Sequence, residues 1–526
     1  MTAAIQHATE PPYERRQPER SALYQVVLRH LQSFLAANEV PSSTAHSLKR
    51  FLRCGLLAAG FVRVRCPECH KESLVAFSCK DRGFCPSCTA RRAAQTAANL
   101  VDLVLPTQPY RQWVFVLPFD LHARVAYDEL LESAVLRVFM EELGEHLRAV
   151  TEPSGELGAV ALSQHFGSTL NVHVHWHILA LDGVYVRRSD AARPGFVPAA
   201  PPTVEQLKEL LRRVASRVRA LVGRRPERLR EEVQATMLRL VGEQATGSAQ
   251  PKLLASHDGF NLHAGTAFDR HERMALERWS RYALRGPLAS CRLSLGPNES
   301  VVYTLRQPRA DGTTQVVFTP ESFLRRLCAV LPAPRRHTIV YFGVFASRHS
   351  MHREVVQSAP GVQQRLLGCR GRWIDWADLL KRVWAWEVLA CACGGTRRVM
   401  AAVHEGPIAQ KILKHLGLAA ELPLLAPARM DPQGELWETG PPDEEYRQVP
   451  APDEFDQRLA ESELEGVMLE RTGPAEAGRR SHVVGVVRVG CVNSCPHGIG
   501  ARTGWKFLPV AGNSYPCYPL PVSCRG

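Results

Sequence analysis

Three histidines lie at alternate positions in an otherwise apolar stretch of this 526-residue chain, NVHVHWHILALDGVY over residues 171–185. Side chains at positions i, i+2 and i+4 of a β-strand point to the same face, so the strand presents His173, His175 and His177 together. The other face carries apolar side chains such as Trp176, as expected for a strand that packs on a core. The pattern therefore predicts a buried strand with an imidazole-lined face.

The spacing of these histidines favours a metal site with open coordination positions. Neighbouring same-face side chains are about 6.6 Å apart and the outer pair about 13 Å, at a rise of about 3.3 Å per residue. One ion with bonds of about 2.1 Å cannot bind all three, so either His173 with His175 or His175 with His177 can chelate it. The preceding strand ends at Gln164-His165, which offers a third ligand. A substrate oxygen could take a remaining position.

A second group of potential ligands lies in CPECHKESLVAFSCKDRGFCPSC, residues 66–88. Two C-x2-C pairs, as in many tetrahedral zinc sites, are formed by Cys66, Cys69, Cys85 and Cys88. Four cysteines leave no position for water, so we predict one structural zinc. His70 and Cys79 are alternative ligands. Further along, Cys391 and Cys393 are closely spaced and have no second pair nearby, so the sequence predicts no second zinc.

A tyrosine surrounded by arginines forms the third group. The stretch DRHERMALERWSRYALRGP, residues 269–287, has helical spacing and ends at a Gly-Pro pair. Positions three and four apart place Tyr282 on one helix face with Arg278, Arg281 and Arg285. Guanidinium groups suit a phosphate. Together with an open divalent metal site, this face predicts phosphodiester transfer in which the phenol attacks the phosphorus.

The composition favours a polyanionic partner, because 65 Lys and Arg against 52 Asp and Glu give a formal charge of +13. Basic residues crowd the cysteine-rich stretch, and we expect Arg82, Arg91 and Arg92 to contact DNA phosphates. No apolar run approaches the roughly 18 residues that span a bilayer, and the polar N-terminus is unlike a signal peptide. We therefore expect a soluble, cytoplasmic protein without a membrane partner.

The order of expected elements indicates an α+β fold with an antiparallel sheet. A strand at 113–119 is followed by a helix near 127–150, two more strands and another helix. The expected domains are a helical segment (1–45), a zinc-binding DNA-recognition domain (46–104), a nuclease domain (105–300) with a helical insertion near 193–255, a C-terminal region (301–424), and a flexible linker and tail (425–526).

Four segments, taken in order, resemble one family. They are CPECH with FSCKDRGFCPSCTARR, SQHFGSTLNVHVHWHILALDGVY, ERWSRYALRGPLASCRLSL, and the downstream stretch from YTLRQPRADG to HTIVYFGVFA. Over residues 45–415 the chain resembles the HUH-type rolling-circle transposases of the insertion-sequence-91 family and the related common-region elements. Better-known members have two tyrosines four residues apart. Here the partner position is Arg278, which resembles the single-tyrosine common-region branch.

The resemblance implies a specific site. His175 and His177 would bind Mg²⁺ or Mn²⁺, with Gln164 as third ligand and His165 as the next choice. Tyr282 would attack single-stranded DNA and form a 5′-phosphotyrosine. The protein would then act as a bacterial, nucleoid-associated transposase on the ends of a mobile element and on target DNA. No G-x4-GK[ST] motor motif is present, so a host helicase or replication would displace the strand.

Three other functions are compatible with these residues. A replication initiator or conjugative relaxase would use the same chemistry on a different DNA. A zinc-dependent DNA-binding regulator would need no catalysis, and a metal hydrolase would use water in place of Tyr282. Which DNA end is cleaved separates the transposase from an initiator or relaxase. Protein attached to the cleaved end separates a tyrosine nucleophile from a hydrolase that uses water.

Overall fold

The computed structural model describes residues 17–81, 83–189, 191, 193–223, 253–306, 308, 312–333, 336–356, 376–384 and 389–428. The chain divides into two compact units. Among the described residues, the cysteine unit comprises 17–94 and 376–428, and the sheet unit comprises 95–356. The boundary falls within helix α3 (Pro86–Asn99).

The cysteine unit combines short helices with a three-stranded antiparallel sheet of order β14-β1-β2. Its elements are η1 (Pro18–Arg20), α1 (Ala22–Ala37), α2 (Ser42–Phe51), η2 (Leu57–Ala59), β1 (Gly60–Arg65), β2 (Glu72–Ala76), α11 (Trp376–Trp384), β14 (Arg398–His404) and α12 (Pro407–His415). Ser21 caps helix α1, since the Tyr24 backbone N–H donates to the Ser21 hydroxyl at 3.3 Å.

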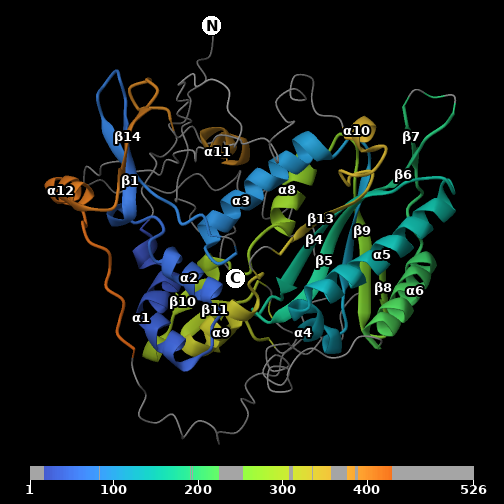
Figure 1. The fold of residues 1–526 in the computed structure, drawn as a ribbon, viewed down its shortest axis with the longest axis horizontal. Coiled ribbons are helices and arrows are strands. Elements are labelled where there is room, and N and C mark those ends of the chain that lie inside the picture. The colour runs from blue at the N-terminus through green and yellow to red at the C-terminus, as the bar shows by residue number, and fades with distance from the viewer. Residues whose placement is uncertain are drawn as a thin grey trace, which may run out of the picture. The chain divides into compact units, whose positions relative to one another are not determined.

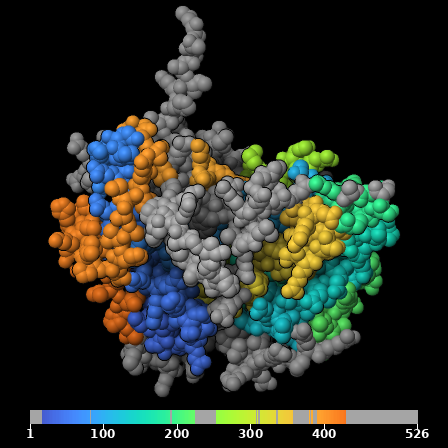
Figure 2. Space-filling view, turned by 45° about the horizontal axis from the view of Figure 1, so that its top comes forward, coloured from blue at the N-terminus to red at the C-terminus, as the bar shows by residue number. Residues whose placement is uncertain are grey.

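Segments from both ends of the described chain build this unit. Phe61 and Val62 of β1 share one buried cluster with Leu413 of α12. Figure 2 shows the N-terminal part in blue and the segment around β14 and α12 in orange, side by side. The core of the unit therefore depends on residues that are hundreds of positions apart in the chain.

The sheet unit is built on a six-stranded antiparallel sheet of order β13-β4-β5-β3-β9-β8 (Figure 1). The strands are β3 (Tyr110–Val116), β4 (Gly158–Phe166), β5 (Val172–Leu181), β8 (Leu254–His257), β9 (Phe260–Phe268) and β13 (Ile339–Gly343). The helices beside it are α4 (Phe119–Tyr127), α5 (Glu129–Val150), α6 (Val204–Gly223) and α8 (Arg273–Ala283). The predicted α+β class with an antiparallel sheet is confirmed.

Helices α5 and α6 lie along one side of this sheet and α8 along the other (Figure 1). On the α5 side, Phe115 of β3 stacks on Trp176 of β5, on Phe139 of α5 and on Phe260 of β9, with ring centroids 4.7–6.0 Å apart. Three neighbouring strands and one helix each supply one of these rings, and each large ring buried here contributes roughly 2–3 kcal/mol of transfer free energy. The aromatic layer holds the strands rigidly beneath the opposite face.

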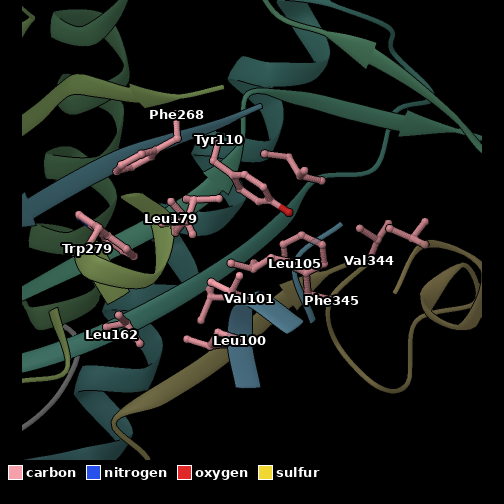
Figure 3. Close-up of a cluster of buried hydrophobic side chains, with 14 of the residues drawn as sticks. Leu100, Val101, Leu105, Tyr110, Leu162, Leu179, Phe268, Trp279, Val344 and Phe345 are labelled. Atoms are coloured by element: carbon pink, nitrogen blue, oxygen red, sulfur yellow. The ribbon is translucent and has the colours of Figure 1, made fainter. Parts of the chain in front are cut away.

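The opposite face is covered by α8 and by the π-helical turn η3 (Leu100–Val104). Leu162 of β4 and Leu179 of β5 pack with Trp279 of α8 and Phe345, as Figure 3 shows. Since α8 carries Tyr282, this cluster determines where the tyrosine lies relative to β5.

Smaller elements complete the sheet unit. They are β6 (Gly183–Val186), β7 (Gly195–Pro198), η4 (Ser290–Arg292), β10 (Leu293–Leu295), η5 (Pro297–Glu299), β11 (Val301–Thr304), β12 (Gln315–Phe318), α9 (Pro320–Ala329) and α10 (His352–Val355). Strands β10, β11 and β12 form one antiparallel sheet, and β6 pairs with β7. Among the described residues, no helix is both long and apolar enough to cross a membrane.

The expected C-terminal region, residues 301–424, contributes to both units. Strand β13 pairs with β4, whereas β14 pairs with β1. Strand pairing depends on free backbone edges and on matching apolar faces, so it does not follow sequence order. In the expected insertion near 193–255, β7 and α6 are described and residues 224–252 are not. The expected linker and tail also lie outside the described residues, except for 425–428.

Candidate active site and metal centres

Strand β5 presents its histidines in register with β4. His175 lies directly opposite Gln164, and His177 lies opposite Leu162. Residues directly opposite each other in an antiparallel pair share a face, so Gln164 is on the histidine face. The ring centroids of His175 and His177 are 5.1 Å apart. The sheet therefore brings one amide and two imidazoles together.

A β-bulge interrupts the alternation of β5 near His173. The register between β4 and β5 shifts between Gln164 and Phe166, which leaves one extra residue on β5 near His173. The His173 ring lies 4.4 Å from the His122 ring of α4. The backbone oxygen of His173 is 3.0 Å from Nδ1 of His175. A carbonyl only accepts, so Nδ1 of His175 donates here and its Nε2 is left as a ligand atom.

All three imidazoles are neutral at physiological pH. Burial, the largest cause, lowers the pKa of His173 to about 4 and the pKa of His177 to about 3. Burial also lowers the pKa of His175 well below its usual value, and the positive charges of neighbouring groups, including Arg285, add to this. A metal ligand must be a neutral imidazole, so the enclosure of these rings keeps them in the binding form.

Gln164 has one satisfied and one unsatisfied side-chain atom. Its Nε2 donates to the backbone oxygen of Ala283 at 2.6 Å, which fixes the amide orientation. Its Oε1 is buried and has no hydrogen-bond partner among the described residues. A buried oxygen without a partner costs about 1–3 kcal/mol, and a cation would relieve that cost. The donor set of two imidazole nitrogens and this oxygen fits a divalent ion with positions left open.

His165 points away from this group. It lies on the other face of β4, where its Nε2 is 2.9 Å from Oε1 of Glu132 on α5. Arg336 donates from Nε to the second Glu132 oxygen at 2.7 Å. Of the two candidates for a third ligand, the structure therefore places Gln164, and not His165, beside the histidines.

Helix α8 presents Tyr282 to the same site. The Tyr282 ring is 6.3 Å from the His177 ring, measured between centroids. The guanidinium carbon of Arg285 lies 3.9 Å from the centre of the tyrosine ring. Nη1 of Arg306 lies 3.5 Å from the Tyr282 hydroxyl, to which it donates. The sequence predicted the neighbourhood of a nucleophile and phosphate-binding charges, but it missed Arg306.

The predicted arginine set is only partly assembled. Arg285 stacks over the ring of Tyr282, whereas Arg278 has an exposed side chain and Arg281 is half-buried. Arg306 follows β11, so only the tertiary fold places it here. Of the three predicted arginines, Arg278 and Arg285 are exposed.

A second missed residue is Gln112, which is completely buried in β3. Its Oε1 accepts a hydrogen bond from Nε1 of Trp279 at 2.7 Å, and its Nε2 lies 3.5 Å from Nδ1 of His177. Gln112 thus links the tyrosine helix to a histidine. The signal available in the sequence was a lone amide in an apolar strand, since buried polar groups require partners.

The four predicted zinc cysteines do not form one set. One cluster contains Cys54, Cys79, Cys85 and Cys88, and the other contains Cys66, Cys69, Cys391 and Cys393. Within each cluster the sulfur atoms all lie within 4.8 Å of one another. The grouping of the two C-x2-C pairs about a single ion is therefore corrected. The hairpin β1–β2 lies between them: six residues of β1 span about 20 Å, so its two ends cannot share an ion.

The first cluster has the form of a structural zinc site. Sulfur–sulfur distances of 3.5 Å join Cys54 to Cys85 and Cys79 to Cys88. Cys79 was an alternative ligand in the sequence, whereas Cys54 was not singled out. Helix α3 starts at Pro86, so Cys88 lies in its first turn. His70 adjoins the second cluster and is not a member of either.

The arginines expected to bind DNA near the cysteines are on or beside α3. Arg92 is exposed and Arg91 is half-buried. Arg82 lies outside the described residues.

Two family models match the chain in the order of these sites. A model described as "Transposase zinc-binding domain" matches residues 26–117, and one described as "Putative transposase" matches residues 158–353. The protein is a transposase, and its substrate is DNA. More particularly, the chain belongs to the insertion-sequence-91 family. The match to a zinc-binding domain and the cysteine clusters are evidence for structural Zn²⁺. Comparisons with curated proteins and with solved structures gave no match.

Proposed function

We propose that this transposase nicks and rejoins single-stranded DNA at the ends of a mobile element through a 5′-phosphotyrosine on Tyr282. The observation that carries the proposal is the position of the Tyr282 ring, 6.3 Å from the His177 ring, on a helix packed against the histidine face. A phenol beside a set of neutral imidazoles is the arrangement that tyrosine-mediated phosphodiester transfer requires.

His175, His177 and Gln164 would hold a Mg²⁺ or Mn²⁺ ion, which would polarise the scissile phosphate when bound. Gln164 also ties this site to the nucleophile, because it donates to the carbonyl of Ala283, the residue after Tyr282. Any shift of α8 would break that hydrogen bond. The position of the phenol and the ligand set are therefore coupled through one amide.

In the proposed step, the Tyr282 oxygen bonds to phosphorus as the bond to the 3′ oxygen of DNA breaks. The phenol loses its proton and the released 3′ oxygen gains one, so the ester is exchanged and no nucleotide cofactor is needed. Arg285 and Arg306 stabilise the phenolate and the charge that develops on the phosphate. A later attack by a 3′-hydroxyl reverses the exchange and joins the strands. Without a motor motif, strand displacement would rely on a host helicase or on replication.

The test uses single-stranded oligonucleotides from the ends of the element, incubated with the protein and Mg²⁺ or Mn²⁺ and separated on a denaturing gel. We expect a covalent protein–DNA adduct with a released 3′-hydroxyl. Tyr282→Phe should abolish the adduct. Tyr341→Phe is the matched control, since this tyrosine on β13 is partly exposed, and it should leave the adduct unchanged.

Three outcomes would reject the proposal. An adduct that persists in Tyr282→Phe would show that another residue is the nucleophile. Cleavage without any attached protein would indicate hydrolysis by water. A DNA-binding regulator would give neither adduct nor cleavage.

A further inference from the structure

We infer that Cys66, Cys69, Cys391 and Cys393 bind a second zinc ion that fastens β14 to the N-terminal hairpin. The sulfur of Cys66 is 3.5 Å from that of Cys393, and the sulfur of Cys69 is 3.5 Å from that of Cys391. In a tetrahedral zinc site with bonds of about 2.3 Å, sulfur atoms are about 3.8 Å apart. All four lie within 4.8 Å of one another, so the cluster has the size of such a site.

The strands bring the two cysteine pairs together at one end of the sheet. Strand β1 ends at Arg65, just before Cys66, and β14 begins at Arg398, shortly after Cys393. Arg65 and Arg398 are direct partners in the antiparallel ladder. The two ligand turns therefore meet where the ladder ends, and an ion there would fix the register of β1 against β14.

Each pair lies in a tight turn closed by backbone hydrogen bonds. The N–H of His70 donates to the carbonyl of Cys66 at 3.0 Å, and the N–H of Gly394 donates to the carbonyl of Cys391 at 2.9 Å. The N–H of Cys391 also donates to the carbonyl of Gly395 at 2.8 Å. These turns hold the sulfur atoms in place, so little ordering is required on metal binding.

A glycine is needed where the two turns approach each other. A Cβ at Gly395 would lie 2.9 Å from the sulfur of Cys66, inside van der Waals contact. Gly394 has φ +88°, a conformation that side chains with a Cβ rarely adopt. The sequence CACGG thus supplies two ligands and the backbone that lets them reach the other turn.

This cluster is separate from the first one, and two of its four cysteines lie outside the residues that the family models match. The hairpin β1–β2 lies between the two clusters, and neither family model reaches Cys391 or Cys393. Four thiolates complete the coordination of zinc and leave no position for substrate. The second ion would be structural, and its role would be to join a C-terminal segment to the zinc-binding domain. This inference does not depend on the chemistry of Tyr282.

The first experiment counts zinc in the full-length protein by elemental analysis. We expect two zinc ions per chain in the unaltered protein and one in the double variant Cys391→Ser/Cys393→Ser. The matched control, Cys291→Ser/Cys328→Ser, changes cysteines outside both clusters and should keep two. One zinc in the unaltered protein, or two in the Cys391/Cys393 variant, would overturn the inference.

A second measurement avoids variants that fail to fold. Cys393 and Cys291 are both exposed, so iodoacetamide should reach either thiol when no metal ion covers it. In the zinc-loaded protein we expect Cys393 to be alkylated at least tenfold more slowly than Cys291, as read by peptide mass spectrometry. After zinc is removed with a chelator, the two rates should become similar. Equal rates in the zinc-loaded protein would contradict a metal at the second cluster.

Discussion

The histidine site and the cysteine clusters both gather metal-ligand side chains, yet they are built in different ways. The histidines lie along one strand in the middle of a sheet, and packed aromatic rings support them from behind. The cysteines lie in loops and turns at the two ends of a hairpin. The register of the sheet sets the positions of the histidines. Short turns set the positions of the cysteines within each pair, and an ion would tie one pair to the other.

The two regions also differ in how complete their ligand sets are. Each cysteine cluster offers four sulfur atoms, which saturate zinc. The histidine face offers two imidazoles and one amide oxygen, with a tyrosine beside them. Closed sites stabilise a fold, and open sites permit chemistry. Four predictions test that division, beginning with the largest expected effect.

Removal of zinc should unfold the loops of the cysteine unit and spare the sheet unit. Zinc binding contributes on the order of 10 kcal/mol of folding free energy in small zinc domains. Without zinc, the remaining interactions should therefore be too weak to keep β1 and β2 folded. Hydrogen exchange after treatment with a chelator should show loss of protection in β1 and β2, with β5 unchanged. Cys54→Ser should give the same pattern for the first cluster. Retained protection of β1 would indicate that the hairpin needs no metal.

His175→Ala should reduce DNA cleavage by about 10³-fold, roughly 4 kcal/mol, because it removes the proposed metal ligand directly opposite Gln164. His173→Ala is the matched control. His173 lies at the bulge beside His122, and its loss should cost less than tenfold. Single-turnover cleavage rates at several Mn²⁺ concentrations would measure both. A larger loss from His173→Ala would move the ligand pair to His173 and His175.

Glu132→Gln should lower the free energy of unfolding by about 3 kcal/mol near pH 7, since it leaves Arg336 buried without its carboxylate. Burial raises the pKa of Glu132, but its hydrogen bond to His165 and the charge of Arg336 outweigh burial and lower it. Because the pKa is lower in the folded state, ionised Glu132 stabilises the protein above the unfolded-state pKa of about 4.3. That stabilisation is lost as the pH falls towards the folded-state pKa.

The acid dependence provides the check on that buried carboxylate. Denaturant titrations at pH 7 and pH 4 should show a smaller difference in Glu132→Gln than in the unaltered protein. Glu129→Gln, at an exposed position on the same helix, should change neither value. Equal pH dependence in all three proteins would mean that Glu132 does not titrate differently on folding.

Gln112→Ala should reduce cleavage by about tenfold, near 1.4 kcal/mol, without preventing metal binding. The substitution removes the amide that accepts from Trp279 and lies beside His177, so both the helix and the imidazole lose a positional restraint. Cleavage rates and Mn²⁺ affinity should be measured separately. Gln206→Ala, in the first turn of α6, is the control and should leave both unchanged.

Local periodicity accounts for what could be predicted from the residues alone. Alternation predicted a strand with His175 and His177 on one face and Trp176 on the other, and both the strand and the buried Trp176 are present. Helical spacing predicted the segment that bears Tyr282, which is α8. Such patterns follow from the backbone geometry of a single element and need no knowledge of its neighbours.

The tertiary structure decided every pairing between elements. The register of β4 against β5 put Gln164 on the histidine face and His165 on the other, and a bulge lies near His173. The β1–β2 hairpin separates the two C-x2-C pairs, so they belong to different clusters. The pairing of β14 with β1 brings Cys391 and Cys393 to Cys66 and Cys69. Arg306 and Gln112 reached the site in the same way. These contacts depend on hydrogen-bond register and on core packing between distant segments, which no spacing along a single sequence contains.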